Sequence, residues 1–291
     1  MFQIITDGAS DIKREEAQKH GIDIVPFYIT LDGQNFAKET EGFSREEFFK
    51  TLANDKNIKP KTSQPNPQDY IDFYIPHLKA GKDILTVTIA SGLSGSYNSA
   101  TQAAKLMAEE YPDRKILVLD TFNITAGQAL IIDQIIKMRE AGFSIQETFE
   151  KAEKIKETTH IYFILETMEF LKRSGRIGGA AALVGGMLKI KPILQMLNNR
   201  VEKFDSVRGT KNALKRMFDY VISEISDKKD DVEFTVGHIS NLEAAIEYKN
   251  NFEKALGKKA GRDVIDIGMM IGVHVGPGAL LVAYCKNYDK V

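Results

Sequence analysis

The sequence predicts an α/β protein: an N-terminal parallel-sheet domain of three layers, followed by a second α/β domain with a mixed sheet. Short apolar runs alternate with helix-like segments in the first half, which is typical of a parallel sheet covered by helices. A tight Asn198-Asn199 turn between two apolar runs in the second half indicates antiparallel pairing. The 291 residues are enough for two domains with a sizeable core.

The first half supplies the strands and helices of the predicted parallel sheet. Apolar runs at residues 2–6, 84–89 and 115–119 predict strands, because each run is short and rich in Ile, Leu and Val. Residues 97–110 predict a helix, since apolar side chains recur on one face at helical spacing, and a second long helix is expected at Thr125–Glu140.

Local signals mark three helix starts. Ser44 and Ser144 are each followed three residues later by glutamate, which is the pattern of a capping box. Pro67 suits the first turn of a helix, because a missing N–H costs nothing there. We expect Pro76 to kink that helix or to end it early.

In the second half, the first predicted element is an antiparallel hairpin of strands at residues 193–197 and 201–204. The remaining expected elements are a helix from Thr210, a strand at 232–237, a helix at Leu242–Leu256, and strands at 264–269 and 279–285. The charged stretch 144–159 predicts a solvated helix between the halves. The predicted domains are therefore residues 1–159 and 160–291.

Composition is that of an ordinary globular protein, with 43% hydrophobic and 27% charged residues. A net charge of −1 gives no overall attraction to nucleic acid or to an anionic membrane. No apolar run approaches the ~18–20 residues of a membrane span. The single cysteine, Cys285, lies in an apolar run and predicts a buried, inert thiol. Without a signal-type leader, we expect a cytoplasmic protein.

Small polar loops at strand ends carry the candidate chemistry. They occupy residues 6–11, 62–65, 91–96 and 272–278. Hydroxyls, free backbone N–H groups and one imidazole can converge from them on a single anion. A polar anion site within an apolar body indicates a ligand with a charged head and an apolar tail.

The loop at residues 91–96 has three serines and two glycines between a predicted strand and a predicted helix. Its serines can bind an anion, or can serve only as helix caps. A third alternative is a serine hydrolase that acts on an acyl ester, with Ser94, Asp266 and His274 in the chain order of a triad. The hydrolase elbow, however, needs Gly-x-Ser-x-Gly, and Gly95 comes one residue early for it.

His274 lies among three glycines and a proline, which predicts a fixed loop between two strands. The other histidines show no metal-binding spacing, so we expect no metal. No phosphate-binding P-loop or dinucleotide fingerprint occurs, and we expect no cofactor. The Gly- and Ala-rich run at 178–186 instead predicts close packing beside a cavity.

These loops together resemble the DegV family over essentially the whole chain. Six segments follow the family's motifs in order. They are residues 6–11 (TDGASD), 62–65 (TSQP), 90–96 (ASGLSGS), 171–177 (LKRSGRI), 188–194 (LKIKPIL) and 274–278 (HVGPG). Two positions depart from the family: Gly8 replaces the usual serine, and Ser174 replaces the usual glycine.

The resemblance implies a non-enzymatic protein that binds a long-chain fatty acid such as palmitate, with the tail in a tunnel at the junction of two domains. Thr62 and Ser94 would hydrogen-bond the carboxylate, with His274 nearby. Ser63 and Ser96 are further candidates in the same loops. In some relatives a separate ATP-dependent fatty acid kinase subunit converts the bound acid to acyl phosphate.

Arg176 and Arg208 are the weaker matches for docking such a kinase subunit. The same resemblance leaves a role in lipid transport or metabolism without a kinase as the other possibility.

Overall fold

A computed structural model describes residues 1–41, 44–55, 58–183 and 190–291 of the chain. The strands are β1 (Gln3–Asp7), β2 (Ile22–Val25), β3 (Tyr28–Thr30), β4 (Ala37–Lys38), β5 (Lys61–Ser63), β6 (Ile84–Thr88), β7 (Ile116–Asp120), β8 (His160–Ile164), β9 (Ile190–Leu197), β10 (Arg200–Arg208), β11 (Val232–His238), β12 (Ile265–Asp266) and β13 (Leu280–Lys286). The α-helices are α1 (Arg14–Lys19), α2 (Arg45–Asn54), α3 (Pro67–Lys79), α4 (Ser96–Glu110), α5 (Thr125–Glu140), α6 (Ile145–Glu157), α7 (Glu169–Ser174), α8 (Thr210–Ile225), α9 (Leu242–Leu256) and α10 (Met269–Val275).

Three sheets organise these elements. The first is fully parallel in the order β2-β1-β6-β7, which confirms the predicted parallel sheet. The second is mixed, in the order β10-β9-β8-β13-β11-β12, with only the β11–β12 pair parallel. A small antiparallel sheet, β4-β3-β5, brings Thr62 to the edge of the molecule's central cavity.

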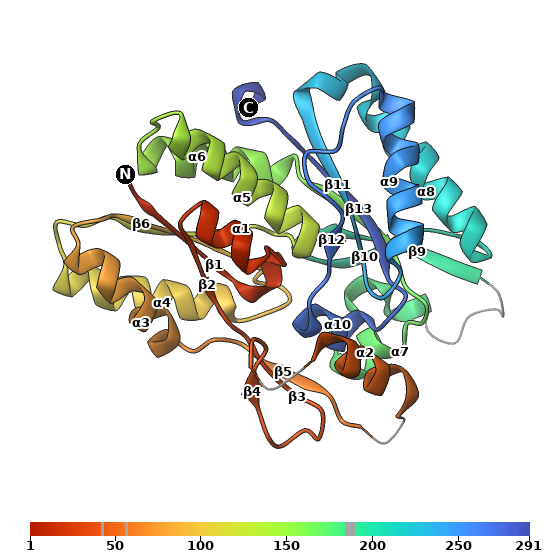
Figure 1. The fold of residues 1–291 in the computed structure, drawn as a ribbon, viewed down its shortest axis with the longest axis horizontal. Coiled ribbons are helices and arrows are strands. Elements are labelled where there is room, and N and C mark those ends of the chain that lie inside the picture. Colours follow the sequence, from red (N-terminus) through yellow and green to blue (C-terminus); the bar gives the residue numbers. More distant parts are fainter. Residues whose placement is uncertain (42–43, 56–57, 184–189) are drawn as a thin grey trace.

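The two large sheets share a layer of helices. α3 and α4 cover one face of the parallel sheet, while α5 and α6 cover the other (Figure 1). α5 also packs against β11 and β13 of the mixed sheet, whose far face carries α8 and α9. α5 is therefore buried along most of its length, which explains why its apolar side chains are not confined to one face.

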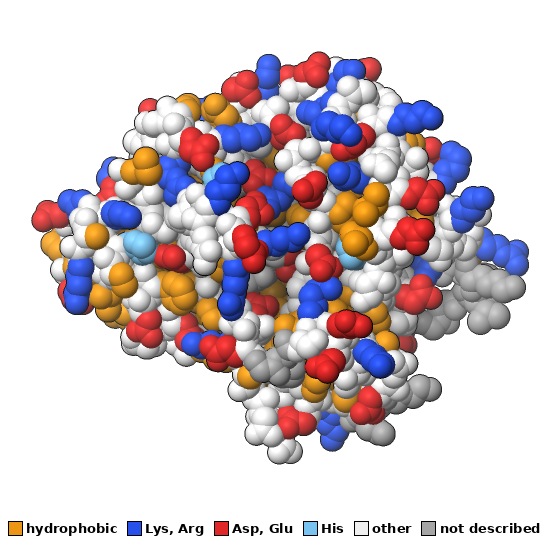
Figure 2. All heavy atoms as spheres, in the orientation of Figure 1, with side chains coloured by type: hydrophobic (Ala, Val, Ile, Leu, Met, Phe, Trp, Pro, Cys, Tyr) orange, Lys and Arg blue, Asp and Glu red, His pale blue; other side chains and the backbone are white. Residues whose placement is uncertain are grey.

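Charges of both signs are mixed on the face of the molecule that Figure 2 draws. Figure 2 shows acidic and basic side chains interspersed over the face drawn, in keeping with the net charge of −1. Cys285 is fully buried in β13, as predicted, and burial raises the pKa of its thiol. None of the helices described above combines the length and the apolar character that a membrane crossing requires.

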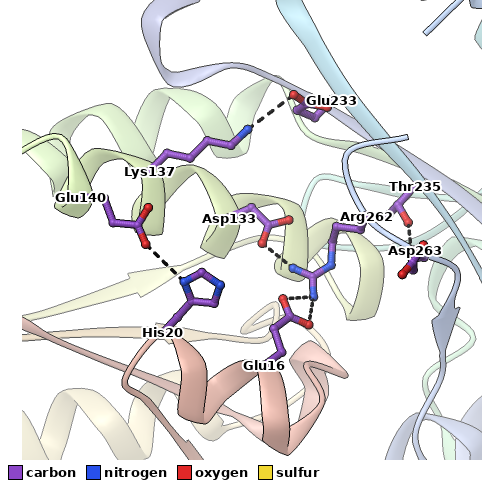
Figure 3. Close-up of polar contacts among 9 residues, drawn as sticks. All are labelled: Glu16, His20, Asp133, Lys137, Glu140, Glu233, Thr235, Arg262 and Asp263. Carbon is purple, nitrogen blue, oxygen red and sulfur yellow. Dashed lines mark hydrogen bonds and ion pairs between the residues drawn. The ribbon is translucent and has the colours of Figure 1, made fainter. Parts of the chain in front are cut away.

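Opposite charges also link the two halves of the chain through Arg262, which lies between α9 and β12. Its guanidinium pairs with Glu16 of α1 at 2.5 Å and with Asp133 of α5, and its side chain is 9% exposed (Figure 3). Lys137 of α5 reaches Glu233 of β11 at 3.5 Å in the same region. These contacts fix the mixed sheet against α1 and α5.

Several local predictions are confirmed. Ser44 and Ser144 accept hydrogen bonds from the backbone N–H groups of Glu47 and Glu147, and the second site is a complete capping box. Pro67 opens α3. The Asn198-Asn199 turn joins β9 and β10 as an antiparallel hairpin, with both asparagines at positive φ.

Three sequence predictions are wrong in part. α3 continues through Pro76 to Lys79 and does not end early: the proline gives up the hydrogen bond of its missing N–H, and the last turn is still helical. The expected strand at 264–269 is limited to β12, and Met269 already starts α10. The expected loop around His274 is the last turn of α10, followed by a turn at Gly276 with φ of 74°. The proposed domain boundary at residue 160 coincides with the start of β8 and stays a prediction.

Candidate functional site

A cavity of about 480 Å³ lies where the end of the parallel sheet faces the mixed sheet. Its apolar lining comes from both halves of the chain. These side chains are Phe27, Pro67, Ile89, Leu93, Ile124, Phe163, Leu171, Val201, Met270, Ile271 and Val275. The polar lining consists of Thr62, Ser63, Gln64, Asn66, Ser94, Ser99, Arg176 and His274. A cavity that is mostly apolar, with a limited polar set, is typical of a site for an amphiphilic small molecule.

Hydrogen bonds link several of these polar residues, and we call this part of the lining the polar wall. Gln64 accepts a hydrogen bond from the backbone N–H of Gly95 at 2.7 Å, which ties the loop after β5 to the loop that carries Ser94. Arg176 donates from Nε to the carbonyl oxygen of Leu93 at 3.3 Å. Four of the five loop residues predicted to contact a ligand, Thr62, Ser63, Ser94 and His274, therefore line one cavity.

Thr62 and His274 form the central pair of this wall. Oγ1 of Thr62 lies 2.9 Å from Nε2 of His274, although the residues are 212 positions apart. Burial, with a smaller contribution from the charge of Arg176, lowers the pKa of His274 to about 3, so the ring is neutral at physiological pH.

The protonation site of the neutral His274 ring determines the direction of its hydrogen bond with the Thr62 hydroxyl. Nδ1 of His274 is buried and has no hydrogen-bond partner among the described residues. A buried donor without a partner is rarer than a buried acceptor without one, so we assign the proton to Nε2. Nε2 then donates to Oγ1 of Thr62, and the hydroxyl hydrogen of Thr62 is free to donate to a ligand in the cavity.

Ser96 has a different position from the other candidates. It is fully buried at the start of α4, and its hydroxyl donates to Oδ2 of Asp7 at 2.7 Å. Oγ of Ser96 also lies 2.6 Å from the hydroxyl of Tyr70. Asp7 accepts from the backbone N–H of Ile89 as well, at 3.0 Å. This network holds the loop in place, and Ser96, Asp7 and Tyr70 are not among the residues that line the cavity.

The two glycines of the loop allow it to contact other segments closely. A side chain at Gly92 would collide with the carbonyl oxygen of Asn199, at the tip of the β9–β10 hairpin. Nδ2 of Asn199 donates to Ser91 at 2.7 Å and lies 3.3 Å from Oδ2 of Asp120. A side chain at Gly95 would likewise overlap Gln64. These glycines therefore let the loop pack against the hairpin tip and against Gln64.

The departures from the family pattern have structural reasons. A Cβ at Gly8 would overlap the carboxylate of Glu39, so glycine leaves room for that side chain. Ser174 ends α7, where its hydroxyl bonds the carbonyl oxygen of Leu171 at 3.3 Å. The predicted close packing of the run at 178–186 holds for Gly178, which abuts Val201. Residues 184–189 lie outside the described part of the chain.

The structure does not assemble the triad of the hydrolase alternative. Asp266 pairs with Arg45 at 2.6 Å and lies 3.7 Å from Nε2 of His238. Nε2 of His274 bonds Thr62, while its Nδ1 contacts no carboxylate among the described residues. Arg208, the last residue of β10, is exposed and lies away from the cavity lining. No group of His, Cys, Asp and Glu in the described residues is arranged to hold a metal.

The sequence analysis gave no role to Gln64, which lines the cavity, or to Asn199, which contacts the loop that carries Ser94. Gln64 belongs to the quoted segment 62–65, and its position after Thr62 was the available signal. Asn199 was recognised only as a turn residue, because sequence gives no information on where a hairpin tip docks.

The chain is similar to known proteins over nearly its whole length. The family model described as "uncharacterised protein, DegV family" matches residues 1–287. A DegV domain-containing protein of Clostridium acetobutylicum is 32% identical, over 97% of this chain and 96% of its own length.

Two solved structures share the fold. A stearic acid-binding protein of Eubacterium ventriosum has a TM-score of 0.92 and 29% identity, with both chains fully covered. A fatty-acid-binding DegV family protein of Thermus thermophilus has a TM-score of 0.88 and 27% identity, over 98% of this chain and 99% of that one. Because the DegV family model matches residues 1–287, nearly the whole length, the chain belongs to the DegV family.

Proposed function

We propose that this protein binds a long-chain fatty acid in the cavity between its two large sheets. The hydroxyls of Thr62 and Ser94 donate hydrogen bonds to the carboxylate. Ser63 lines the cavity beside them, and His274 orients the Thr62 hydroxyl through their hydrogen bond. The observation that carries the proposal is the Thr62–His274 pair at one wall of an otherwise mostly apolar cavity. The fatty-acid-binding relatives of the same fold support it.

The energetics suit an amphiphile. Burying ~15 methylenes at ~0.8 kcal/mol each contributes roughly 12 kcal/mol before the cost of association. A buried carboxylate without partners would cost several kcal/mol. Hydrogen bonds to a charged group contribute roughly 1.5–3 kcal/mol each, so two hydroxyls offset much of that cost. The tail therefore dominates affinity, and the polar wall selects the head group.

A double variant tests the head-group assignment. Thr62→Ala with Ser94→Ala removes both hydroxyls, and we expect the purified variant to lose bound palmitate or another C14–C18 acid that the wild type retains. Lipid extraction and mass spectrometry measure the retained acid, and circular dichroism checks the fold. Wild-type levels of acid in a folded double variant would overturn the assignment.

The bound acid is presented, in this proposal, to a separate ATP-dependent kinase subunit in the cytoplasm. Arg176 borders the cavity and Arg208 is exposed at the end of β10, so both can contact a partner. Arg176→Ala or Arg208→Ala is expected to abolish acyl phosphate formation with that subunit while lipid content stays unchanged. Undiminished acyl phosphate formation by both variants would show that these arginines do not dock the kinase.

A further inference from the structure

Glu39, which follows β4, is fixed against the small sheet that carries Thr62. Its backbone N–H donates to the carbonyl oxygen of Phe27 at 2.9 Å, and its Oε1 accepts from the backbone N–H of Phe27 at 3.1 Å. Phe27 lines the main cavity and directly precedes β3. β3 pairs in turn with β5, where Ile29 lies opposite Thr62. The position of Thr62 therefore depends on the contact between Glu39 and Phe27.

The same carboxyl also lies over Gly8, at the end of β1. A Cβ at Gly8 would overlap Oε1 of Glu39, so the two residues are in close contact. Asp7, the neighbour of Gly8, accepts from the hydroxyl of Ser96 at 2.7 Å. Ser96 ends the loop that carries Ser94. The carboxyl of Glu39 is thus packed between the sheet that carries Thr62 and the support of the Ser94 loop.

The charged groups around Glu39 give it no counter-charge. Within the described part of the chain, no Lys, Arg or His side chain forms an ion pair with it. Arg45 of α2 lines the same groove, of about 680 Å³, but pairs with Asp266 of β12 at 2.6 Å. Asp11 and Asp7 act on Glu39 as like charges. The other charged side chains that line this groove are Lys13, Arg14, Asp23, Lys38 and Glu41.

These surroundings keep the carboxyl neutral. Burial raises the pKa of Glu39 to about 8, and the charges of Asp11 and Asp7 act in the same direction, against the hydrogen bond from Phe27. At pH 7 an uncharged group therefore fills the space over Gly8. Ionisation would add a charge beside two other carboxyls, and moving out into the groove would let water solvate that charge. Such a movement breaks the contacts of Glu39 with Phe27 and Gly8.

We propose that Glu39 is a positioning residue for the fatty-acid head group: its neutral carboxyl fixes the sheet that carries Thr62 relative to the Ser94 loop, and its ionisation loosens that arrangement. This inference rests on the proposed binding of the carboxylate by Thr62 and Ser94. It adds a dependence on pH to that binding, with the carboxylate bound less tightly as pH rises. The apolar tail contributes equally at either pH.

The test compares palmitate with hexadecanol, which has the same tail, at pH 7 and at pH 9. Each ligand displaces a fluorescent fatty acid whose own affinity is measured at each pH. We expect wild-type palmitate affinity to fall about tenfold between the two pH values, the ratio for a required proton on a group with a pKa of about 8. Hexadecanol affinity should change by less than about threefold, because this ligand has no carboxylate.

Two variants place the proton. Glu39→Gln keeps an uncharged group of the same shape, and its palmitate affinity should be equal at pH 7 and pH 9. The matched control Glu41→Gln removes an exposed carboxylate two positions along the chain and should keep the wild-type loss. Asp11, whose pKa burial raises to about 7, also titrates near this range. A loss that disappears in Asp11→Asn and persists in Glu39→Gln would overturn the inference.

The contact with Gly8 has its own test. Gly8→Ala displaces the carboxyl of Glu39, and we expect it to weaken palmitate binding at pH 7 about fivefold or more. The same change made together with Glu39→Ala, where the space is free, should weaken binding by less than about twofold relative to Glu39→Ala alone. Equal effects of Gly8→Ala in both backgrounds would show that Glu39 does not transmit the contact to the site.

A calorimetric measurement on the wild type decides the inference even if the variants do not fold. Titrations at pH 8 in buffers of different ionisation enthalpy should show uptake of about half a proton per bound palmitate. Palmitate that fails to bind at pH 7 removes the proposed function and this inference with it. Palmitate that binds equally well at pH 7 and pH 9, without proton uptake, removes only the inference.

Discussion

Replacing Thr62 with valine keeps the shape of the side chain and removes its hydroxyl. Oγ1 of Thr62 accepts from His274 at 2.9 Å, and its own hydrogen points to the ligand in our assignment. Losing one hydrogen bond to a carboxylate costs roughly 1.5–3 kcal/mol, which corresponds to about 10- to 150-fold weaker binding. The tail contribution of roughly 12 kcal/mol is unaffected, so binding is weakened but not abolished.

A pair of ligands isolates the effect on the head group. Palmitate and its alcohol, hexadecanol, have the same tail, but only palmitate has a carboxylate. We expect Thr62→Val to lower palmitate affinity by the factor above and hexadecanol affinity by less than about threefold, in fluorescence displacement. Equal losses for both ligands would mean that the variant distorts the cavity. An unchanged palmitate affinity would show that Thr62 does not contact the carboxylate.

Three further predictions concern the scaffold. The Cβ that Gly92→Ala adds would collide with Asn199. We therefore expect a lower melting temperature in thermal denaturation and faster release of bound acid in stopped-flow displacement. Equal values for variant and wild type would show that close packing of Gly92 against the hairpin tip contributes nothing to stability or binding. Burial raises the pKa of Glu39 to about 8 from its usual 4.5. Folding therefore takes up a proton at pH values between 4.5 and 8, and over this range the contribution of Glu39 to the free energy of unfolding falls by about 1.4 kcal/mol per pH unit as pH rises. Glu39→Gln should remove that slope from urea unfolding between pH 5 and 7.5, and parallel curves for variant and wild type would contradict it. Arg262→Leu leaves Glu16 and Asp133 without their partner, and we expect it to lower the free energy of unfolding in urea by about 3 kcal/mol. The control Lys215→Ala, in the exposed pair with Asp219, should lower it by less than about 0.5 kcal/mol. Similar losses for the two variants would mean that the buried contacts of Arg262 stabilise the fold no more than an exposed pair.

Most of the strand and helix order follows from local pattern. The run at 84–89, the helix Thr125–Glu140 and the hairpin around Asn198-Asn199 all appear close to where periodicity and turn residues place them. Local pattern fails where tertiary contacts decide. His274 is helical because the Met269–Val275 segment packs its apolar side chains into the core, which outweighs the glycine beside them.

The site was predictable as a set of loops but not as a geometry. The loops could be selected because hydroxyls at strand ends are suited to bind anions, whereas the choice of Thr62 and Ser94 within them rested on the resemblance to the DegV family. The burial of Ser96 against Asp7 and Tyr70 was not visible in sequence, since a capping serine and a ligand-binding serine have the same local pattern. The pairing of Arg262 with Asp133 likewise joins residues 129 positions apart, which no local rule predicts.

Native mass spectrometry of the purified protein, followed by solvent extraction and lipid identification, tests the central claim most directly. The account predicts one added mass per chain that resolves into a free C14–C18 fatty acid. A protein that is empty, and that stays empty when incubated with palmitate, would contradict it.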